Sequence, residues 1–437
     1  SKRLGQEYRH TERHDDRSEF KRDYDRLIFS APFRRLQNKT QVFPLPGSIF
    51  VHNRLTHSLE VASVGMSLGN DVARDVIRRH PELAGTLIEE IGTVVATACL
   101  AHDMGNPPFG HSGEKALQTF FTEGKGAALK PLLNRDFWDD ITHFEGNANA
   151  FRLLTHRFCG RRKGGFVMTY TMLASIVKYP FASSCAGSHG KFGFFSTEKE
   201  FFRRVAEELG MKRLSDDGEP LRYARHPLVY LVEAADDICY EIMDIEDAHK
   251  LKILSFEETK NLLLGFFEDD VKASILKRIQ DEELTDDNEQ VVYMRACVIG
   301  KLENVCADAF LKHEQEILDG TFEGELIDHV NERERLAYQR CTETAYAKIY
   351  RSKPVLDIEL AGYHIINTLM EQMTEAAVHP ERFYSKQLLR RVSSQYDINS
   401  DDLETRIMAV IDFVSGMTDV FALDFYQKLN GTSLPIV

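Results

Sequence analysis

The chain has 437 residues, of which 43% are hydrophobic and 28% charged, and its 68 acidic and 54 basic residues give a formal net charge of −14. This composition is typical of a globular protein, and it excludes extensive disorder and a broad coat on nucleic acid. The most apolar run, Ile91 to Ala101, is interrupted by Gly92 and two threonines and is far shorter than the roughly 20 residues that span a bilayer. The sequence therefore predicts no membrane association.

The N-terminal segment and the cysteines indicate the compartment. The first residues, SKRLGQEYRH, contain no apolar segment, so we expect no secretory signal. Seven cysteines are scattered without CxxC spacing, which favours a reducing environment and argues against a disulfide framework or a thiolate zinc site. We therefore expect a cytoplasmic protein.

Hydrophobic periodicity predicts an all-α fold, because apolar residues recur at helical spacing through most of the chain, as in 57–68 and 91–103. Between residues 40 and 51, β-forming side chains flank a Pro/Gly turn and predict a short hairpin near the N-terminus. The Gly- and Ser-rich stretch 181–193 is typical of a mobile loop. After residue 255, acidic clusters among helical apolar positions indicate solvated helix faces. We expect one compact body over residues 1–437.

Potential metal ligands occur in three separate segments. His102 and Asp103 end an apolar helix, where adjacent imidazole and carboxylate groups can face one ion. His57 lies at the start of an earlier helix, and Asp236 and Asp237 follow two alanines on a later apolar helix, where a buried charge needs a partner. Each segment alone also fits a core histidine or an acid that complements a helix dipole. Together they supply two imidazoles and two carboxylates.

His111 and Glu114 form a second candidate group, three residues apart at the expected start of a helix. A surface histidine and a first-turn acid are the ordinary explanation of such a pair. Close after the His102–Asp103 pair, however, a histidine oriented by a carboxylate is suited to moving protons at a metal-bound phosphate.

These motifs resemble the deoxyguanosinetriphosphate triphosphohydrolases (dGTPases) of the HD-domain superfamily. The resemblance covers about residues 20–430 and places an HD metal core at about 50–250, followed by a C-terminal helical region at about 251–437. It rests on a series of segments in the family's order: 33–45, 54–61, 102–114, 143–147, 173–180, 233–247 and 415–419.

The resemblance implies a divalent metal bound by His57, His102, Asp103 and Asp236, with Asp237 as the alternative fourth ligand. Nitrogen and carboxylate ligands favour Mn²⁺ or Mg²⁺, with Fe, Co and Ni as alternatives. The resemblance also implies a catalytic role for His111 and Glu114, although their proton roles stay open.

An acidic protein that binds a triphosphate needs local cations, and Arg54 and Lys178 are the candidates. Tyr179 is expected to pack on the sugar and exclude a 2′-hydroxyl, and Asp244 to hold the 3′-hydroxyl. Ordinary structural roles are the alternative for every one of these residues. The implied substrate-binding set is Gln41, Arg54, Asn106, His143, Lys178, Tyr179, Tyr240 and Asp244.

The expected reaction is hydrolysis of dGTP, or of several dNTPs, to deoxynucleoside and inorganic triphosphate by a homo-oligomer, expected to be a hexamer. The alternatives are another HD-type nucleotide phosphohydrolase and a non-catalytic protein that senses nucleotides or binds single-stranded DNA. A basic cluster with neighbouring aromatic residues is a candidate site for single-stranded DNA as an effector. It comprises Arg152, His156, Arg157, Arg161, Arg162 and Lys163, with Phe151 and Phe166.

Overall fold

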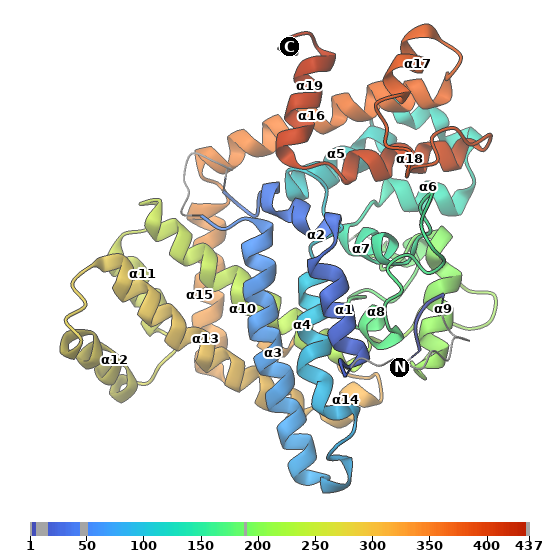
Figure 1. Ribbon diagram of the computed structural model, residues 1–437. Helices are drawn as coiled ribbons and strands as arrows, with labels where there is room; N and C mark the ends of the chain where they lie inside the picture. Colours follow the sequence, from blue (N-terminus) through green and yellow to red (C-terminus); the bar gives the residue numbers. More distant parts are fainter. Residues whose placement is uncertain (1, 6–15, 44–50, 188–189, 434–437) are drawn as a thin grey trace. The chain divides into compact units, whose positions relative to one another are not determined.

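The computed structural model describes residues 2–5, 16–43, 51–187 and 190–433, and these are mainly helical (Figure 1). The predicted all-α class is confirmed. The turn of the predicted N-terminal hairpin falls in residues 44–50, outside the described residues, so the hairpin is not shown. Extended pairing occurs as isolated bridges, such as Arg3 with Thr169 and Phe181 with Arg222. Within the described ranges, no helix is both long enough and apolar enough to cross a membrane.

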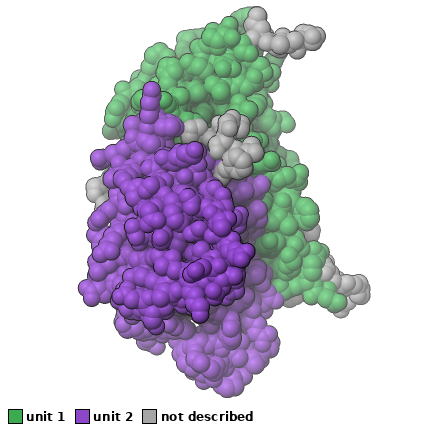
Figure 2. Space-filling view, turned by 90° about the vertical axis from the view of Figure 1, so that its left-hand side faces the viewer, with its two compact units in different colours: residues 1–40, 101–226, 357–437 green, residues 41–100, 227–356 purple. Residues whose placement is uncertain are grey.

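The chain divides into two compact units, each assembled from segments distant in sequence (Figure 2). Unit 1 comprises residues 1–40, 101–226 and 357–437, and unit 2 comprises residues 41–100 and 227–356. The expected single body, with its metal core at about 50–250, stays a prediction.

Unit 2 is built around α10 (Pro227–Lys250), which packs against α3 (Arg54–Arg79) and α13 (Asp287–Lys312). α3 also lies close to α4 (Ile91–Ala101), because a Cβ atom added at Gly69 would lie only 2.7 Å from the Cα atom of Gly92. The other helices of this unit are η2 (Pro81–Leu83), η3 (Leu87–Glu90), α11 (Phe256–Leu264), α12 (Asp269–Asp281), α14 (Glu314–Leu318), η8 (Leu326–His329), α15 (Glu332–Thr344) and the π-helical turn η9 (Ala345–Ile349).

The start of α3 is set by a capping box. Asn53 Oδ1 accepts a hydrogen bond from the Thr56 amide at 3.0 Å, and Thr56 Oγ1 accepts one from the Asn53 amide at 3.1 Å. These bonds satisfy amides that a helix start otherwise leaves without partners. They place Arg54 and His57 in the first turn of the helix.

The core of unit 1 joins the middle of the chain to its C-terminal helices. Fully buried aromatic and aliphatic side chains, such as Phe121 on α5 (Gly110–Thr122), Leu369 on α16 (Lys353–Val378) and Val410 on α18 (Leu403–Ser415), belong to one hydrophobic cluster. The remaining helices of this unit are α1 (Glu19–Ile28), α2 (Ala31–Arg35), η1 (Leu36–Asn38), η4 (Lys125–Leu132), α6 (Arg135–Thr142), α7 (Gly146–Thr155), α8 (Tyr170–Ser175), η5 (Ser183–Cys185), η7 (Ser196–Glu198), α9 (Lys199–Glu208), α17 (Phe383–Leu389) and α19 (Asp419–Leu429).

Candidate active site

Unit 2 brings together His57 and Asp236, which are 179 residues apart in sequence. His57 Nε2 lies 2.9 Å from Asp236 Oδ1, and His57 is only 2% exposed. Asp237 lies in a different environment. Burial raises the pKa of the Cys306 thiol on α13, and the nearby Asp237 carboxylate raises it further. The backbone carbonyl of Asp237 accepts a hydrogen bond from the Tyr338 hydroxyl. The contact with His57 favours Asp236 as the metal ligand.

Tyr240 and Asp244, both on α10, meet a third side chain, Tyr350. The Tyr350 hydroxyl donates to Asp244 Oδ2 at 2.7 Å, and its ring stacks on that of Tyr240 with centroids 6.1 Å apart. Burial raises the pKa of Asp244 well above its usual range. Sequence reasoning missed Tyr350, although the spacing of Tyr346 and Tyr350 by one helical turn was a usable signal.

Two further predicted substrate residues of unit 2 are at least partly buried. Arg54 is 7% exposed at the start of α3, and Gln41 is partly buried just before residues 44–50. Their expected contacts with phosphate and sugar stay predictions.

In unit 1, His102 and Asp103 directly follow the last residue of α4. His102 Nε2 lies 3.7 Å from Asp103 Oδ1, and Asn106 Nδ2 donates to the same oxygen at 2.5 Å. Asn106 therefore orients a candidate metal ligand, and its expected place near the substrate phosphates stays a prediction. Gly105 is required by close packing, because a Cβ atom there would lie 2.0 Å from the Gly146 carbonyl oxygen at the start of α7.

His111 and Glu114 lie on the first turns of α5, as expected. The helix is preceded by Phe109, whose φ of 60° is in the left-handed region. His111 Nδ1 lies 3.6 Å from Glu114 Oε2, and the His111 side chain is 80% exposed whereas that of Glu114 is 8% exposed. The Glu114 carboxylate raises the pKa of His111 above its ordinary value. An exposed imidazole held by a buried carboxylate is suited to general acid–base chemistry.

Glu114 is itself held by the start of α7, where the Gly146 amide donates to Glu114 Oε1 at 2.7 Å. The preceding residue, Glu145, is 2% exposed and receives a hydrogen bond from Lys191 Nζ at 2.7 Å. The sequence pattern indicated neither Glu145 nor Lys191 as a candidate site residue. It also favoured a mobile loop at 181–193, whereas Phe192 in this segment is fully buried.

The remaining predicted site residues of unit 1 are partly buried. His143 Nδ1 lies 2.8 Å from the Asp139 carbonyl oxygen, so the ring is oriented by its own helix, α6. Lys178 Nζ lies 5.8 Å from the centre of the Tyr179 ring, and that ring meets the ring of Phe181 edge-on at 6.2 Å.

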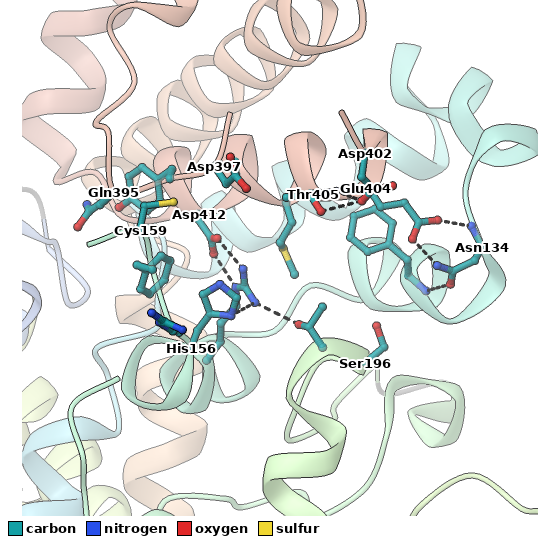
Figure 3. A pocket seen from close by; sticks show the side chains of 18 residues that line it. Asn134, His156, Cys159, Ser196, Gln395, Asp397, Asp402, Glu404, Thr405 and Asp412 are labelled. Atoms are coloured by element: carbon teal, nitrogen blue, oxygen red, sulfur yellow. Dashed lines mark hydrogen bonds and ion pairs between the residues drawn. The ribbon is translucent and has the colours of Figure 1, made fainter. Parts of the chain in front are cut away.

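The predicted basic cluster is only partly a surface feature. Arg152 is 3% exposed and forms ion pairs with Asp412 at 2.8 Å and Glu198 at 2.7 Å. It lines a cavity of about 410 Å³, whose other lining residues include Asp412 and His156 (Figure 3). Phe151 is fully buried against Phe202, so it presents no stacking surface. The prediction that Arg152 and Phe151 belong to a DNA-binding surface is wrong. Both side chains are buried, Arg152 by its ion pairs with Asp412 and Glu198 and Phe151 by its contact with Phe202.

His156 and four arginine and lysine residues of the cluster are at least partly exposed. The Arg161 guanidinium lies 5.4 Å from the centre of the Phe166 ring, and these two residues line a hollow with Arg26 and Arg162. Phe166 is only 9% exposed, so it presents little of the stacking surface that was expected. The four are Arg157, Arg161, Arg162 and Lys163.

Comparison with known proteins places this arrangement in a family. The HD domain matches residues 54–141, and the phosphohydrolase-associated domain matches residues 329–428. The deoxyguanosinetriphosphate triphosphohydrolase-like protein of Pseudomonas aeruginosa is 37% identical over 428 residues, which cover 96% of this chain and 95% of that protein. The chain belongs to the deoxyguanosinetriphosphate triphosphohydrolase family.

Other dGTPase-family relatives match over nearly the whole chain. The deoxyguanosinetriphosphate triphosphohydrolase-like protein of Synechocystis is 36% identical over 99% of this chain and 98% of its own length. The deoxyguanosinetriphosphate triphosphohydrolase of Yersinia enterocolitica is 28% identical over 94% of this chain and 93% of its own length. The HD domain and these relatives identify the chain as a hydrolase of the HD phosphohydrolase type.

Proposed function

We propose that this protein is a metal-dependent hydrolase that cleaves dGTP, or a set of dNTPs that includes dGTP, into deoxynucleoside and inorganic triphosphate. The observation that carries the proposal is the His111–Glu114 pair, an exposed imidazole with a raised pKa beside a buried carboxylate, directly after the His102–Asp103 pair of an HD domain. A protein that only binds nucleotides has no need of such a pair.

The metal would be held by His57, His102, Asp103 and Asp236. The first three offer two imidazoles and a carboxylate, and the Asp236 carboxylate lies beside His57. This donor set fits Mn²⁺ or Mg²⁺, with Fe, Co and Ni as alternatives, and not a sulfur-preferring ion. When bound, the metal supplies Lewis-acid polarisation of a phosphate oxygen and a water molecule of lowered pKa.

His111 would handle protons at the α-phosphate, and Glu114 would orient it. The leaving group is the 5′-oxygen of the nucleoside, a poor leaving group that needs a proton. The raised pKa of His111 keeps more of its imidazole protonated near neutral pH, which suits proton donation to that oxygen. Cleavage at this position distinguishes the reaction from removal of the γ-phosphate.

The substrate would be bound by the residues that the family resemblance indicates. Arg54 and Lys178 would neutralise phosphate charge, with Asn106 and His143 in their supporting shell. Tyr179 and Gln41 would contact the sugar. Asp244 would hold the 3′-hydroxyl, since its carboxyl group already accepts one hydroxyl, from Tyr350.

The deciding experiment incubates the purified protein with each of the four dNTPs and Mn²⁺ or Mg²⁺ in ¹⁸O-labelled water. We expect deoxyguanosine and tripolyphosphate in equal amounts by anion chromatography, with the label in tripolyphosphate. Release of orthophosphate or pyrophosphate, or label in deoxyguanosine, would contradict attack at the α-phosphorus. Turnover of nucleoside monophosphates or cyclic nucleotides alone would favour another HD-type phosphohydrolase.

The assembly and its effector complete the proposal. We propose a cytoplasmic homo-oligomer, a hexamer by family resemblance, that responds to single-stranded DNA through the hollow lined by Arg161 and Arg162. Sedimentation velocity measures the assembly, and fluorescence anisotropy with a labelled oligonucleotide measures DNA binding. Unchanged DNA binding in the variant Arg161→Ala/Arg162→Ala would exclude this surface.

A further inference from the structure

Lys191 connects a loop to the candidate active site. Its Nζ atom donates to Glu145 Oε1 at 2.7 Å, and its side chain is 38% exposed, whereas that of Glu145 is 2% exposed. The neighbouring Gly190 lies against His143, because a Cβ atom at Gly190 would be 3.8 Å from His143 Cδ2. The loop that carries Lys191 is thus in contact with two segments around the His111–Glu114 pair.

Glu145 controls the start of α7, and α7 holds Glu114. Glu145 Oε2 accepts hydrogen bonds from the amides of Asn147 at 2.6 Å and Ala148 at 3.4 Å, so the side chain caps the helix. The amide between these groups, that of Gly146, donates to Glu114 Oε1 at 2.7 Å. A shift of the Glu145 cap therefore moves the donor that orients Glu114.

The charged groups around the Lys191–Glu145 and Glu114–Gly146 contacts have opposite effects on one another. Burial and the nearby Glu114 carboxylate raise the pKa of Glu145, and Lys191 opposes that rise. The charged groups that face His111 are Glu114, which raises its pKa, and Lys191 and Lys115, which lower it. Lys191 itself is near Glu145, Glu114 and Tyr179. Lys191 is thus a cation that compensates the buried carboxylates of Glu145 and Glu114.

We propose that Lys191 is a positioning residue that, by pairing with Glu145, fixes the cap of α7 and so holds Glu114 and His111 in their working arrangement. This inference rests on the proposed function, because it assigns Lys191 a role in the proton transfer by His111. It differs from a direct contact between Lys191 and substrate phosphate, which would act on substrate affinity.

A double-variant cycle separates the two roles. We would compare Lys191→Met, Glu145→Gln, the double variant and the conservative variant Lys191→Arg, with Lys115→Met as a control that removes a nearby charge but not the Glu145 contact. We expect Lys191→Met to lower kcat between roughly 10- and 100-fold, the scale of a misplaced catalytic group. KM should change little, and Lys191→Arg should retain most of the activity.

The pH dependence of kcat gives a second readout. Loss of Lys191 should loosen the Glu114 contact, which is the largest cause of the raised pKa of His111, so the limb of the profile governed by His111 should move to lower pH, although removal of the Lys191 charge alone would move it to higher pH. Glu145→Gln weakens the same cap and should move the limb in the same direction. The double variant should show no larger shift of this limb, and be no slower, than the more affected single variant. Lys115→Met should move the limb less than Lys191→Met does.

Histidine ¹³C NMR titration of the metal-free protein, with the His111 signal assigned from His111→Gln, measures the same pKa without turnover. The inference is overturned if Lys191→Met raises KM alone, if the two single effects multiply in the double variant, or if the His111 titration stays in place. The proposed function fails separately, if the wild-type protein releases no tripolyphosphate or if His111→Gln stays fully active.

Discussion

The substitution Asp419→Asn, at the start of α19, tests whether buried hydrogen bonds from this helix support the segment that carries His111. Asp419 is 6% exposed, and its Oδ2 atom accepts hydrogen bonds from the Thr40 amide at 2.8 Å and the Thr40 hydroxyl at 2.5 Å. Its Oδ1 atom accepts one from the Phe109 amide at 2.9 Å. Phe109 has a left-handed backbone and directly precedes α5, which carries His111.

The magnitude follows from these contacts. Asparagine keeps one acceptor oxygen but turns an NH₂ group towards either Thr40 or Phe109, which leaves at least one buried donor unsatisfied at a cost of about 1–3 kcal/mol. The left-handed conformation of Phe109 costs roughly 1–2 kcal/mol. In the variant, the Phe109 amide can lose the hydrogen bond that stabilises this conformation. Because the strain at Phe109 is already present in the wild-type fold, we expect the free energy of unfolding of unit 1 to fall by about 1–3 kcal/mol, the cost of the unsatisfied donor. We also expect kcat to fall, because the first turn of α5 loses an anchor.

Urea denaturation followed by circular dichroism measures the stability, and initial rates of dGTP hydrolysis measure kcat. Asp424→Asn is the matched control, because Asp424 lies on the same helix but pairs at the surface with Lys428 at 2.7 Å. A surface pair of this kind contributes about 0–1 kcal/mol. Equal unfolding midpoints for Asp419→Asn and Asp424→Asn would refute the reasoning.

Three further predictions concern ligands and buried charge. Asp236→Ala should lose bound metal by elemental analysis while Asp237→Ala retains much of it, and the reverse result would exchange the two assignments. Asp244→Asn should reduce the preference for dGTP over dideoxy-GTP measured by kcat/KM, whereas equal turnover of both nucleotides by the wild-type protein would show that Asp244 does not read the 3′-hydroxyl. Arg152→Met should destabilise the protein by about 3–5 kcal/mol in chemical denaturation, because it removes the guanidinium that pairs with the two buried carboxylates Asp412 and Glu198. Burial raises the pKa of Glu198, but the Arg152 charge together with His156 and a Thr197 hydrogen bond outweighs burial and lowers it. The stability contributed by Glu198 is therefore present above its unfolded pKa and is lost as the pH falls through its folded pKa. A loss from Arg152→Met that stayed constant down through that acid range would contradict this assignment.

Local sequence patterns were sufficient for the features that depend on short-range chemistry. Helical periodicity predicted the all-α class, because an amphipathic helix repeats its apolar positions within a few residues. The three-residue spacing of His111 and Glu114 predicted their proximity on the first turns of α5, since side chains at i and i+3 share a helix face. The motif around His102 and Asp103 likewise indicated the HD domain.

Only the tertiary structure decided which charged and polar side chains are buried and what they bind. Arg152 reads as one of a run of basic residues, yet Asp412, 260 residues later, holds it inside. Tyr350 meets Asp244 across 106 residues, and Lys191 meets Glu145 across 46. A buried charge is stable only beside a compensating group. That group can come from any part of the chain, so local composition does not identify it, and the fold does.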